Sequence, residues 1–257
     1  MSQDTEISLL AKQRNIKLAF GVEESKSLFR LRLARYKGLA EAVADYIKER
    51  EGQARQFALL DVGVGSGRSM RYIEAQGVAD RISFYGLDNS PHRLSSLYKS
   101  DKWQLAQANA EKEMPYESGL FDIVLCEQVL EHLANPAAAI DEIARVLRPD
   151  GLLVLGVPIF PWGISHLRKL MVGVSSRWFG VSHSHLQSFG CMSIKSLVLA
   201  HNRFKIRKSY GFRIISGGVF AALEDYLWWY RFNRWLGRTV PSLCTEIQII
   251  ALRNTTA

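Results

Sequence analysis

The pattern of apolar and polar positions alternates between two kinds of element over the middle of the chain. Continuous apolar runs at residues 57–62, 82–87, 121–126 and 152–155 predict buried strands, and periodic segments between them predict helices. The resulting order over residues 57–157 is strand, helix, strand, helix, strand, strand, helix, strand. Such alternation predicts a parallel sheet that helices cover on both faces, with ligands at the carboxyl ends of its strands.

An amphipathic helix is predicted before this core. From Glu23 to about Arg50, apolar residues recur at alternating steps of four and three, at Phe29, Leu33, Tyr36, Ala40, Val43 and Ile47. We expect the apolar face of this helix to pack on the edge of the sheet. Gly38 lies inside the helix at some cost in helix propensity.

The alternation is lost after residue 157. Residues 158–190 contain a turn-rich apolar run, and residues 217–238 form an aromatic amphipathic segment that is too charged to span a bilayer. Runs at 204–207 and 243–251 predict two further strands. We therefore divide a single domain, residues 1–257, into an N-terminal helical cap (1–56), a cofactor-binding core (57–157) and a region of lid insertions with the last two strands (158–257).

A glycine-spaced loop follows the first predicted strand. Gly63, Gly65 and Gly67 let the backbone turn sharply and let a ligand approach it, and the free N–H groups of the next helix point over the strand end. A dinucleotide fingerprint would need glycine at position 68, where this chain has Arg68, and no triphosphate-binding lysine follows. The loop therefore predicts one wall of a nucleotide-like cofactor site.

The second predicted strand ends on Asp88, roughly 20 residues beyond the glycines. An acidic side chain at this position suits the two hydroxyl groups of a ribose. The alternative is an N-cap role for the helix that opens near Ser90 and Pro91. The two roles are compatible with each other.

The net charge of +8 is concentrated in the C-terminal part of the chain. Residues 1–150 hold 20 basic and 22 acidic residues, whereas residues 151–257 hold 13 basic and 3 acidic ones and five of the six tryptophans. This imbalance favours an anionic or amphipathic partner. Aromatic residues in the core and basic residues in solvent would give the same composition.

Compartment and membrane topology follow from what the chain contains. There is no apolar run of about 18 residues, which argues against a transmembrane helix, and charges throughout the first twenty residues argue against a signal peptide. Cys126, Cys191 and Cys244 are widely spaced without a metal or disulfide pattern. They predict buried free thiols in a reducing cytoplasm.

Two further motifs complete the order of the core. The run Phe121–Cys126 leads into Glu127-Gln-Val-Leu-Glu-His-Leu133, and Leu147-Arg-Pro-Asp-Gly151 leads into another apolar run. In this order the motifs resemble the class I S-adenosylmethionine-dependent methyltransferases, most closely the group that acts on small molecules, quinones and lipids. The resemblance covers residues 57–157 and continues more loosely through His185–Phe189. It implies an α/β fold with a Rossmann-like, doubly wound sheet, mostly parallel with an antiparallel last strand.

The resemblance also implies which residues bind S-adenosylmethionine. Asp61 and the glycine loop would face the methionine moiety, Asp88 the ribose, and Asn89 the adenine side, while Asn109 replaces an aspartate that the group often has near the adenine amine. The implied cofactor set is Asp61, Gly63, Val64, Gly65, Asp88, Asn89, Asn109, Ala110, Glu111, Cys126, Glu127 and Gln128. For Asp61, capping of the turn is the alternative role.

Methyl transfer to a hydroxyl or a weak carbon acid needs a general base. His132 is the leading candidate because histidine titrates near neutral pH, and a structural histidine is the alternative. Residues 158–190 resemble a substrate lid, in which His183 and His185 are alternative bases. With the aromatic segment 217–238, this makes Trp162, His183, His185, Trp228 and Trp229 candidate acceptor residues. Trp228 and Trp229 would point about 100° apart on a helix, so both cannot be buried against one surface. Some quinone-type members of the group hold a divalent cation with acidic residues and a histidine in this segment. Glu127, Glu131 and His132 are too few ligands to predict such a site here, so we expect no metal.

These observations predict an S-adenosylmethionine-dependent methyltransferase that acts on a small or amphipathic acceptor, lipid-like or anionic, and that contacts an anionic surface peripherally. Two alternatives stay open. The basic C-terminal part favours an RNA or protein methyltransferase, although the chain has no Asn-Pro-Pro-Tyr motif and no nucleic-acid module. A non-catalytic cofactor-binding scaffold would not need the complete pocket.

Overall fold

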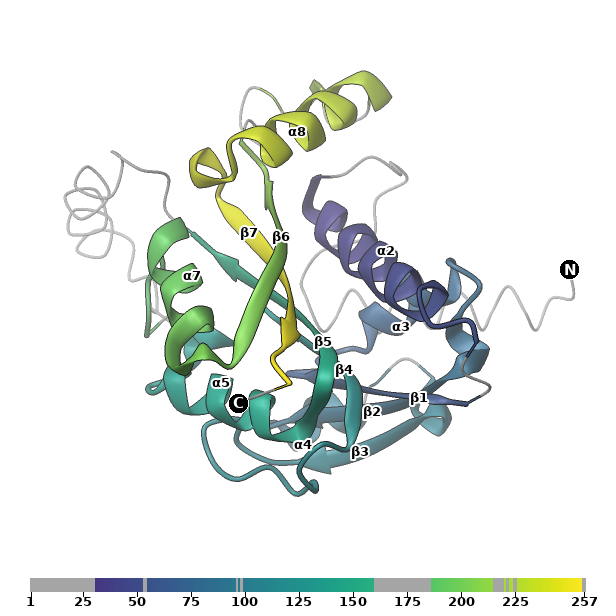
Figure 1. Ribbon diagram of the computed structural model, residues 1–257. Helices are drawn as coiled ribbons and strands as arrows, with labels where there is room; N and C mark the ends of the chain where they lie inside the picture. The colour runs from purple at the N-terminus through teal and green to yellow at the C-terminus, as the bar shows by residue number, and fades with distance from the viewer. Residues whose placement is uncertain are drawn as a thin grey trace, which may run out of the picture.

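The computed structural model describes residues 31–52, 55–95, 97, 99–159, 186–214, 220, 222–223 and 226–255 (Figure 1). In this part of the chain, seven strands form one sheet in the order β3-β2-β1-β4-β5-β7-β6. The strands are β1 (Phe57–Val62), β2 (Ile82–Asp88), β3 (Trp103–Gln107), β4 (Phe121–Glu127), β5 (Leu147–Pro158), β6 (Phe204–Phe212) and β7 (Glu246–Arg253). Strands β1 to β5 are parallel, and β7 is antiparallel to both β5 and β6. The predicted fold class is confirmed.

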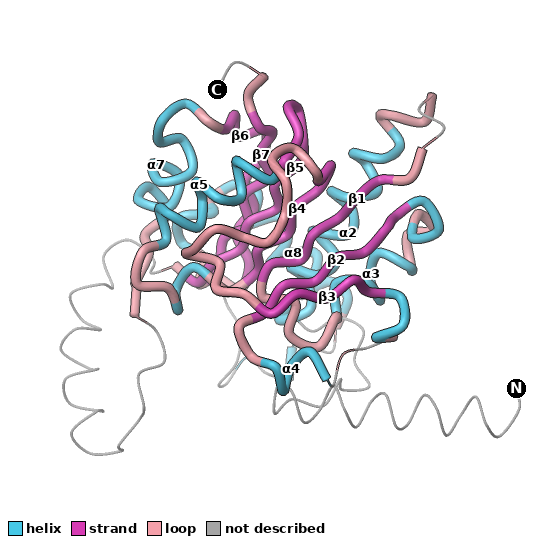
Figure 2. Tube along the Cα trace, turned by 90° about the horizontal axis from the view of Figure 1, so that it is seen from below, coloured by secondary structure: helices cyan, strands magenta, loops and turns pink. Residues whose placement is uncertain are grey.

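Helices lie on both sides of this sheet (Figure 2). The α-helices are α2 (Ala34–Lys48), α3 (Arg68–Glu74), α4 (Pro91–Ser95), α5 (Pro136–Val146), α7 (Cys191–Leu199) and α8 (Leu227–Thr239). The short 3₁₀ helices are η1 (Leu31–Leu33), η2 (Ala79–Arg81), η3 (Ser100–Lys102), η4 (Leu130–His132), η5 (Ala200–Asn202) and η7 (Pro241–Leu243). No helix in the described ranges is long and apolar enough to cross a membrane.

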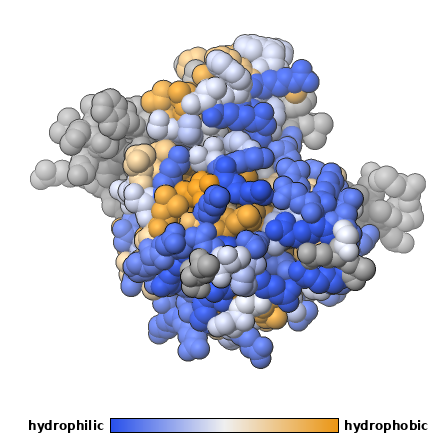
Figure 3. Space-filling model, viewed as in Figure 1, coloured by the Kyte–Doolittle hydropathy of each residue, from blue (hydrophilic) through white to orange (hydrophobic). Residues whose placement is uncertain are grey.

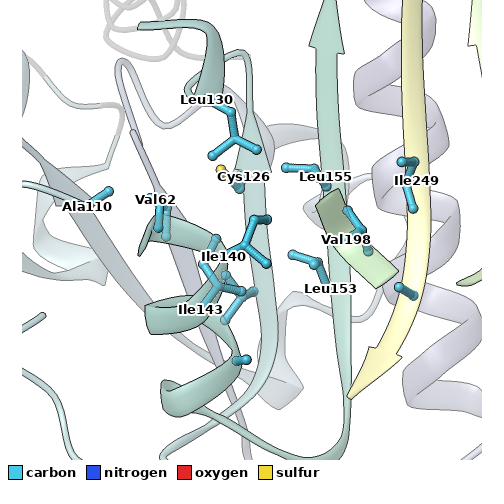
Figure 4. Packing of buried hydrophobic residues seen from close by; sticks show 14 of the residues in the cluster. Val62, Ala110, Cys126, Leu130, Ile140, Ile143, Leu153, Leu155, Val198 and Ile249 are labelled. Atoms are coloured by element: carbon cyan, nitrogen blue, oxygen red, sulfur yellow. The ribbon is translucent and has the colours of Figure 1, made fainter. Parts of the chain in front are cut away.

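The first hydrophobic core joins the sheet to α5 and α7. Ile140 and Ile143 of α5 and Val198 of α7 are buried against inward-facing residues of β5, such as Leu153 and Leu155 (Figure 4). Helix α5 begins at Pro136, directly after Asn135, whose side-chain oxygen accepts a hydrogen bond from the amide of Ala138 (3.2 Å). This helix follows the end of β4 and fixes the segment between them beside the sheet.

The second core lies on the opposite face and includes α2. Leu39, Val43 and Ile47 of α2 are fully buried in the cluster that also contains Leu59 of β1 and Val154 of β5. The predicted amphipathic helix is therefore present from residue 34 to 48, and residues 23–30 lie outside the described part. Our expectation that it packs on the edge of the sheet is wrong: it covers a face, because the central strands present apolar side chains on both sides.

Strand β5 begins earlier than the apolar run predicted. The predicted turn around Pro149 and Gly151 lies inside the strand, where Asp150 has a positive φ of 58° and the register between β4 and β5 shifts near Phe121. The strand thus accommodates the turn residues as a local irregularity of the kind that β-bulges produce in sheets.

Helix α8 packs closely on β6. Gly237 lies so close to the backbone of Gly211 that a Cβ atom at position 237 would collide with the Gly211 carbonyl oxygen. Trp229 is buried (6% exposed) whereas Trp228 is 57% exposed. This confirms that the two adjacent tryptophans cannot both be buried.

We predict that Gly237→Ala lowers the free energy of unfolding by about 1–3 kcal/mol, because the new methyl group meets backbone that cannot move aside. The higher helix propensity of alanine, worth about 1 kcal/mol, offsets part of this loss. Urea denaturation measures the effect. The control is Gly52→Ala, where a Cβ atom would meet no atom within 4 Å, and it should change stability by less than about 0.5 kcal/mol. Unchanged stability in Gly237→Ala would contradict close packing of α8 on β6.

Candidate active site

The carboxyl ends of the parallel strands carry a row of acidic residues. Asp88 ends β2, Asp61 lies near the end of β1, and Glu127 ends β4. Asp61 pairs with Gly86 of β2 on one side and with Leu125 of β4 on the other. The sheet therefore places side chains that are far apart in sequence at one edge, as the pattern predicted.

The glycine loop between β1 and α3 is tied back to β2. The amides of Gly63 and Val64 donate to the carbonyl of Leu87 (2.7 and 3.1 Å), and Gly63, Gly65 and Gly67 have positive φ angles of 71°, 55° and 69°. These angles favour glycine, and a Cβ atom at position 63 would also collide with Val129. The loop thus needs glycine for its own conformation and for its packing.

Asp88 connects the glycine loop to the turn before α4. Its side chain is 3% exposed, one carboxylate oxygen accepts a hydrogen bond from the Gly65 amide (3.1 Å), and the other accepts one from the Ser90 amide (2.9 Å). Asp88 therefore caps the turn before α4 through the Ser90 amide, although it is not the N-cap residue itself, since the helix begins at Pro91. The ribose-binding role stays a prediction, and the carboxylate lies beside the glycine loop where that role requires it.

Asp61 is buried between the end of β1 and the first turn of α3. Its carboxylate accepts a short hydrogen bond from the hydroxyl of Ser69. Burial raises the pKa of Asp61 to about 7; the Ser69 hydrogen bond lowers it and the charge of Asp88 raises it further. Around neutral pH this group is therefore poised between its neutral and its ionised form, and a cation beside it would favour ionisation.

Residues predicted to lie near the adenine form a turn after β3. The side-chain oxygen of Asn109 accepts a hydrogen bond from the Glu111 amide (2.9 Å), and the Glu111 carboxylate accepts one from the Asn135 amide. Ala110 is buried between them, whereas Asn89 is exposed. The Asn109 amide thus takes the local structural role that an aspartate could also perform.

A second polar group surrounds Glu127 where β4, β5 and β7 adjoin. Glu127 pairs with Gly156 of β5, which pairs with Gln248 of β7, and the Gln248 side-chain amide donates to the Glu127 carboxylate (2.5 Å) and to the Arg35 carbonyl (3.1 Å). A Cβ atom at position 156 would collide with the Glu127 carboxylate. Gly156 therefore provides the space in which this side chain lies.

Two arginines enclose the start of β7. The guanidinium groups of Arg35 and Arg213 contact different carboxylate oxygens of Glu246, at 3.2 and 2.6 Å. Burial lowers the pKa of Arg35, but Tyr36 and the charges of Glu246 and Glu127 raise it above its usual value. Arg35 is thus a permanent cation close to the buried acids. We refer to Arg35, Glu127, Arg213, Glu246 and Gln248 as the β7 polar cluster.

Glu127 and Glu131 are carboxylic acids with strongly perturbed acidity. Burial is the main cause in both: it raises the pKa of Glu127 to about 8 against the charge of Arg35, and the pKa of Glu131 to about 7. Within the described residues, one oxygen of Glu127 and both oxygens of Glu131 have no hydrogen-bond partner. Perturbed carboxyl groups of this kind are frequent at functional sites.

The remaining candidates after β4 differ in their exposure. Cys126 is fully buried in the first core (Figure 4), and its contact with the cofactor stays a prediction. Gln128 has a positive φ of 58°, and its amide donates to the Gly156 carbonyl (2.8 Å). His132 ends η4 and its side chain is exposed. Its neighbour Glu131, by contrast, is buried.

The acceptor-side candidates are only partly placed. Trp162, His183 and His185 lie outside the described residues, together with residues 160–185 of the predicted lid. Trp228 and Trp229 lie on α8, which follows β6 and so begins at the end of the sheet that holds the carboxyl ends of β4 and β5. All three cysteines are free, as predicted, although Cys191 is half-buried. Across the described ranges, no three acidic, histidine or cysteine side chains gather in a way that could hold a metal ion.

Of the β7 polar cluster, only Glu127 was predicted from the sequence, and the other four residues were missed. The signal was present for two of its members, because Glu246 and Gln248 interrupt an otherwise apolar strand at alternate positions. No such signal marks Arg35 or Arg213, since each reaches Glu246 from a distant part of the chain. Ser69 was also missed as the partner of Asp61.

Comparison with known proteins agrees with this geometry. Residues 60–155 match the family model of the methyltransferase domain. The ubiquinone biosynthesis O-methyltransferase of Yersinia enterocolitica is 32% identical over 110 residues, which are 42% of this chain and 45% of that protein. This chain therefore aligns with only about half the length of the curated relatives that it matches.

Solved structures share the fold over most of the chain. A candidate sarcosine dimethylglycine methyltransferase from Galdieria sulphuraria has a TM-score of 0.59 at 15% identity and covers 95% of this chain and 98% of its own. An S-adenosylmethionine-dependent methyltransferase from Thermotoga maritima has a TM-score of 0.52 at 14% identity and covers 86% and 93%. At these identities the likeness concerns the fold alone. Residues 60–155 thus match a methyltransferase domain, and the fold of the chain is the one found in solved S-adenosylmethionine-dependent methyltransferases.

Proposed function

We propose that this protein transfers a methyl group from S-adenosylmethionine to an oxygen atom of a small amphipathic acceptor. The observation that carries the proposal is the row of Asp88, Asp61 and Glu127 at adjacent strand ends inside the matched domain. S-adenosylmethionine, when bound, supplies a methyl group on a positively charged sulfur. A row of acidic side chains beside a glycine loop suits a ligand that carries hydroxyl groups at one end and positive charge at the other.

In this proposal the residues divide the work along the edge of the sheet. Asp88 holds the ribose hydroxyls, and Asp61 faces the charged methionine end. The acceptor lies on the side of β4, β5 and β7, where Glu131 is buried, Glu127 is half-buried and Arg35 supplies a fixed positive charge. Alignment of the acceptor oxygen with the methyl group is then the main contribution of the protein, because in-line displacement depends on orientation.

An oxygen acceptor is supported by two arguments. Several curated relatives are named ubiquinone biosynthesis O-methyltransferases, and the acceptor side of the site contains carboxyl groups that can accept or hold a proton near neutral pH. His132 stays the proposed general base, with Glu131 as its buried neighbour. The lipid-like character of the acceptor and a cytoplasmic location stay predictions.

We predict that Asp88→Asn weakens S-adenosylmethionine binding by roughly 10- to 100-fold, or about 1.4–2.8 kcal/mol, because a charged acceptor for two hydroxyl groups is lost. Calorimetry measures the affinity. The control is Asp80→Asn, an exposed residue just before the opposite end of the same strand, which should bind as the parent does. Equal affinity of Asp88→Asn and the parent would limit Asp88 to holding the loops together.

We predict that S-adenosylmethionine binds roughly tenfold more weakly at pH 6 than at pH 8. Asp61 has a pKa of about 7, so it is mostly neutral at pH 6, and only the ionised form attracts the positive end of the cofactor. The affinity should therefore rise as the pH rises through 7. In Asp61→Asn the affinity should be weak and nearly independent of pH. A parallel pH dependence in the parent and in this variant would assign the titration to another group.

We predict that His132→Gln lowers the rate constant kcat for a phenolic acceptor by about 10²–10⁴-fold, the usual contribution of a general base, while cofactor affinity stays within about threefold. Phenols are the first acceptors to test because their hydroxyl must lose its proton. Transfer of a labelled methyl group measures kcat. His201→Gln, an exposed histidine in η5, is the control. If His132→Gln is fully active and Glu131→Gln is not, Glu131 is the base. Cofactor binding without transfer to any acceptor would favour a scaffold.

A further inference from the structure

The outer face of α8 carries a continuous row of exposed aromatic side chains. Trp228, Phe232 and Trp235 are 57%, 38% and 58% exposed. At about 100° per residue they fall within an arc of about 60° on the helix. Their rings adjoin one another and the buried Trp229: Trp229 and Phe232 lie 5.7 Å apart between centroids, and Phe232 and Trp235 lie 6.2 Å apart.

The exposed apolar surface extends beyond these three residues. Tyr226 and Leu227 at the start of the helix and Phe220 before it are 56%, 40% and 42% exposed, and the Phe220 ring stacks on Trp229 at 5.9 Å. Contiguous exposed apolar surface of this kind usually marks a site of interaction, whereas single exposed residues do not.

Arginines border the aromatic row on one side. Arg231 and Arg238 are exposed and lie about 40–60° around the helix from Trp235. Arg234 is only 11% exposed and contacts Glu41 at 3.4 Å. The sequence Leu227–Thr239 contains no acidic residue, and Glu224 and Asp225 precede it in the chain. The outer face therefore combines large aromatic rings with positive charge.

The opposite face of α8 fixes this orientation. Trp229, Asn233 and Gly237 are buried, and Gly237 contacts the backbone of Gly211 on β6. The Asn233 side chain donates to the Trp229 carbonyl (3.1 Å). Because the inner face is held by close backbone packing, the helix presents its aromatic row outward in the folded protein. Figure 3 shows the molecular surface in the view of Figure 1.

We infer that the outer face of α8 docks on the surface of a membrane that contains anionic lipids. Tryptophan and phenylalanine rings are suited to the boundary between headgroups and acyl chains, and arginines beside them reach the lipid phosphates. The helix has 13 residues and is about 20 Å long, so it lies in the plane of the surface. The inference goes beyond the proposed reaction and stands on α8 alone.

Charge favours a lipid surface over a second copy of this chain. In a twofold contact the same face meets itself, so Arg231 and Arg238 would approach the identical arginines of the other copy without an acidic residue of α8 to pair with. An anionic bilayer instead supplies a phosphate for each guanidinium group. Helix α8 also begins at the sheet end that carries the acidic row, so a docked protein would hold its candidate site near the bilayer.

The test is sedimentation of the full chain with vesicles of phosphatidylcholine alone or with about one-third phosphatidylglycerol, at physiological salt. We expect the anionic vesicles to bind at least tenfold more tightly than the neutral ones. Arg231→Glu combined with Arg238→Glu should weaken this binding at least tenfold, since each basic residue near such a surface contributes appreciably. Trp228→Ala combined with Trp235→Ala should do the same and remove the blue shift of tryptophan fluorescence on binding.

The control is Lys205→Glu combined with Lys208→Glu on β6, which changes the net charge equally at other exposed positions. It should bind within about threefold of the parent. Cofactor affinity and far-ultraviolet circular dichroism should be unchanged in all variants, which separates this inference from the proposed reaction and from unfolding. Equal loss in the control, equal binding to neutral vesicles, a dimer that disappears in the tryptophan variant without lipid, or RNA binding that depends on the same arginines would each overturn the inference.

Discussion

The direction of β7 is the constraint on which the rest of the site depends. Strand β7 is inserted between β5 and β6 and runs against both of them. Its first residues therefore lie at the same edge as the last residues of the parallel strands. A parallel β7 would place Glu246 and Gln248 at the far end of the sheet, away from Glu127 and Arg35. The antiparallel strand thus extends the polar edge from the glycine loop towards α8.

Burial of acids at this edge has an energetic consequence for the folded protein. Asp61, Glu127 and Glu131 all have pKa values raised to about 7 or 8, mainly because burial disfavours their charged forms. A group whose pKa is raised on folding stabilises the protein in its protonated form, and that contribution is lost as the pH rises through the raised pKa. The protein without ligand should accordingly lose stability progressively as the pH rises from about 4, the usual pKa of these acids, to about 8. Positive charge brought by a ligand offsets this loss, which couples binding to stability.

Local features of the sequence predicted the fold and the places of the glycine loop and of Asp88 in it. Both lie at strand ends as expected, because each is a property of one short segment, while their contacts with a cofactor stay predictions. The contact between Arg35 and Gln248 could not be predicted in this way, since it joins residues more than 200 positions apart. The face covered by α2 was mispredicted for the same reason: an apolar helix face reveals that it is buried but not against which surface. The exposure of His132 likewise depends on how η4 turns after β4.

The contact between Gly156 and Glu127 links two positions, because a side chain at 156 would force the Glu127 carboxylate to move. Any side chain larger than hydrogen at 156 would occupy the space of the Glu127 carboxylate. In a family of related chains, a larger residue at the position of Gly156 should therefore occur together with a shorter one at the position of Glu127. Replacing both residues together would change the shape of the space beside the end of β4 without disturbing the strands that form it. Changes of acceptor among relatives of this fold would then be sought first as paired exchanges at these two strand ends.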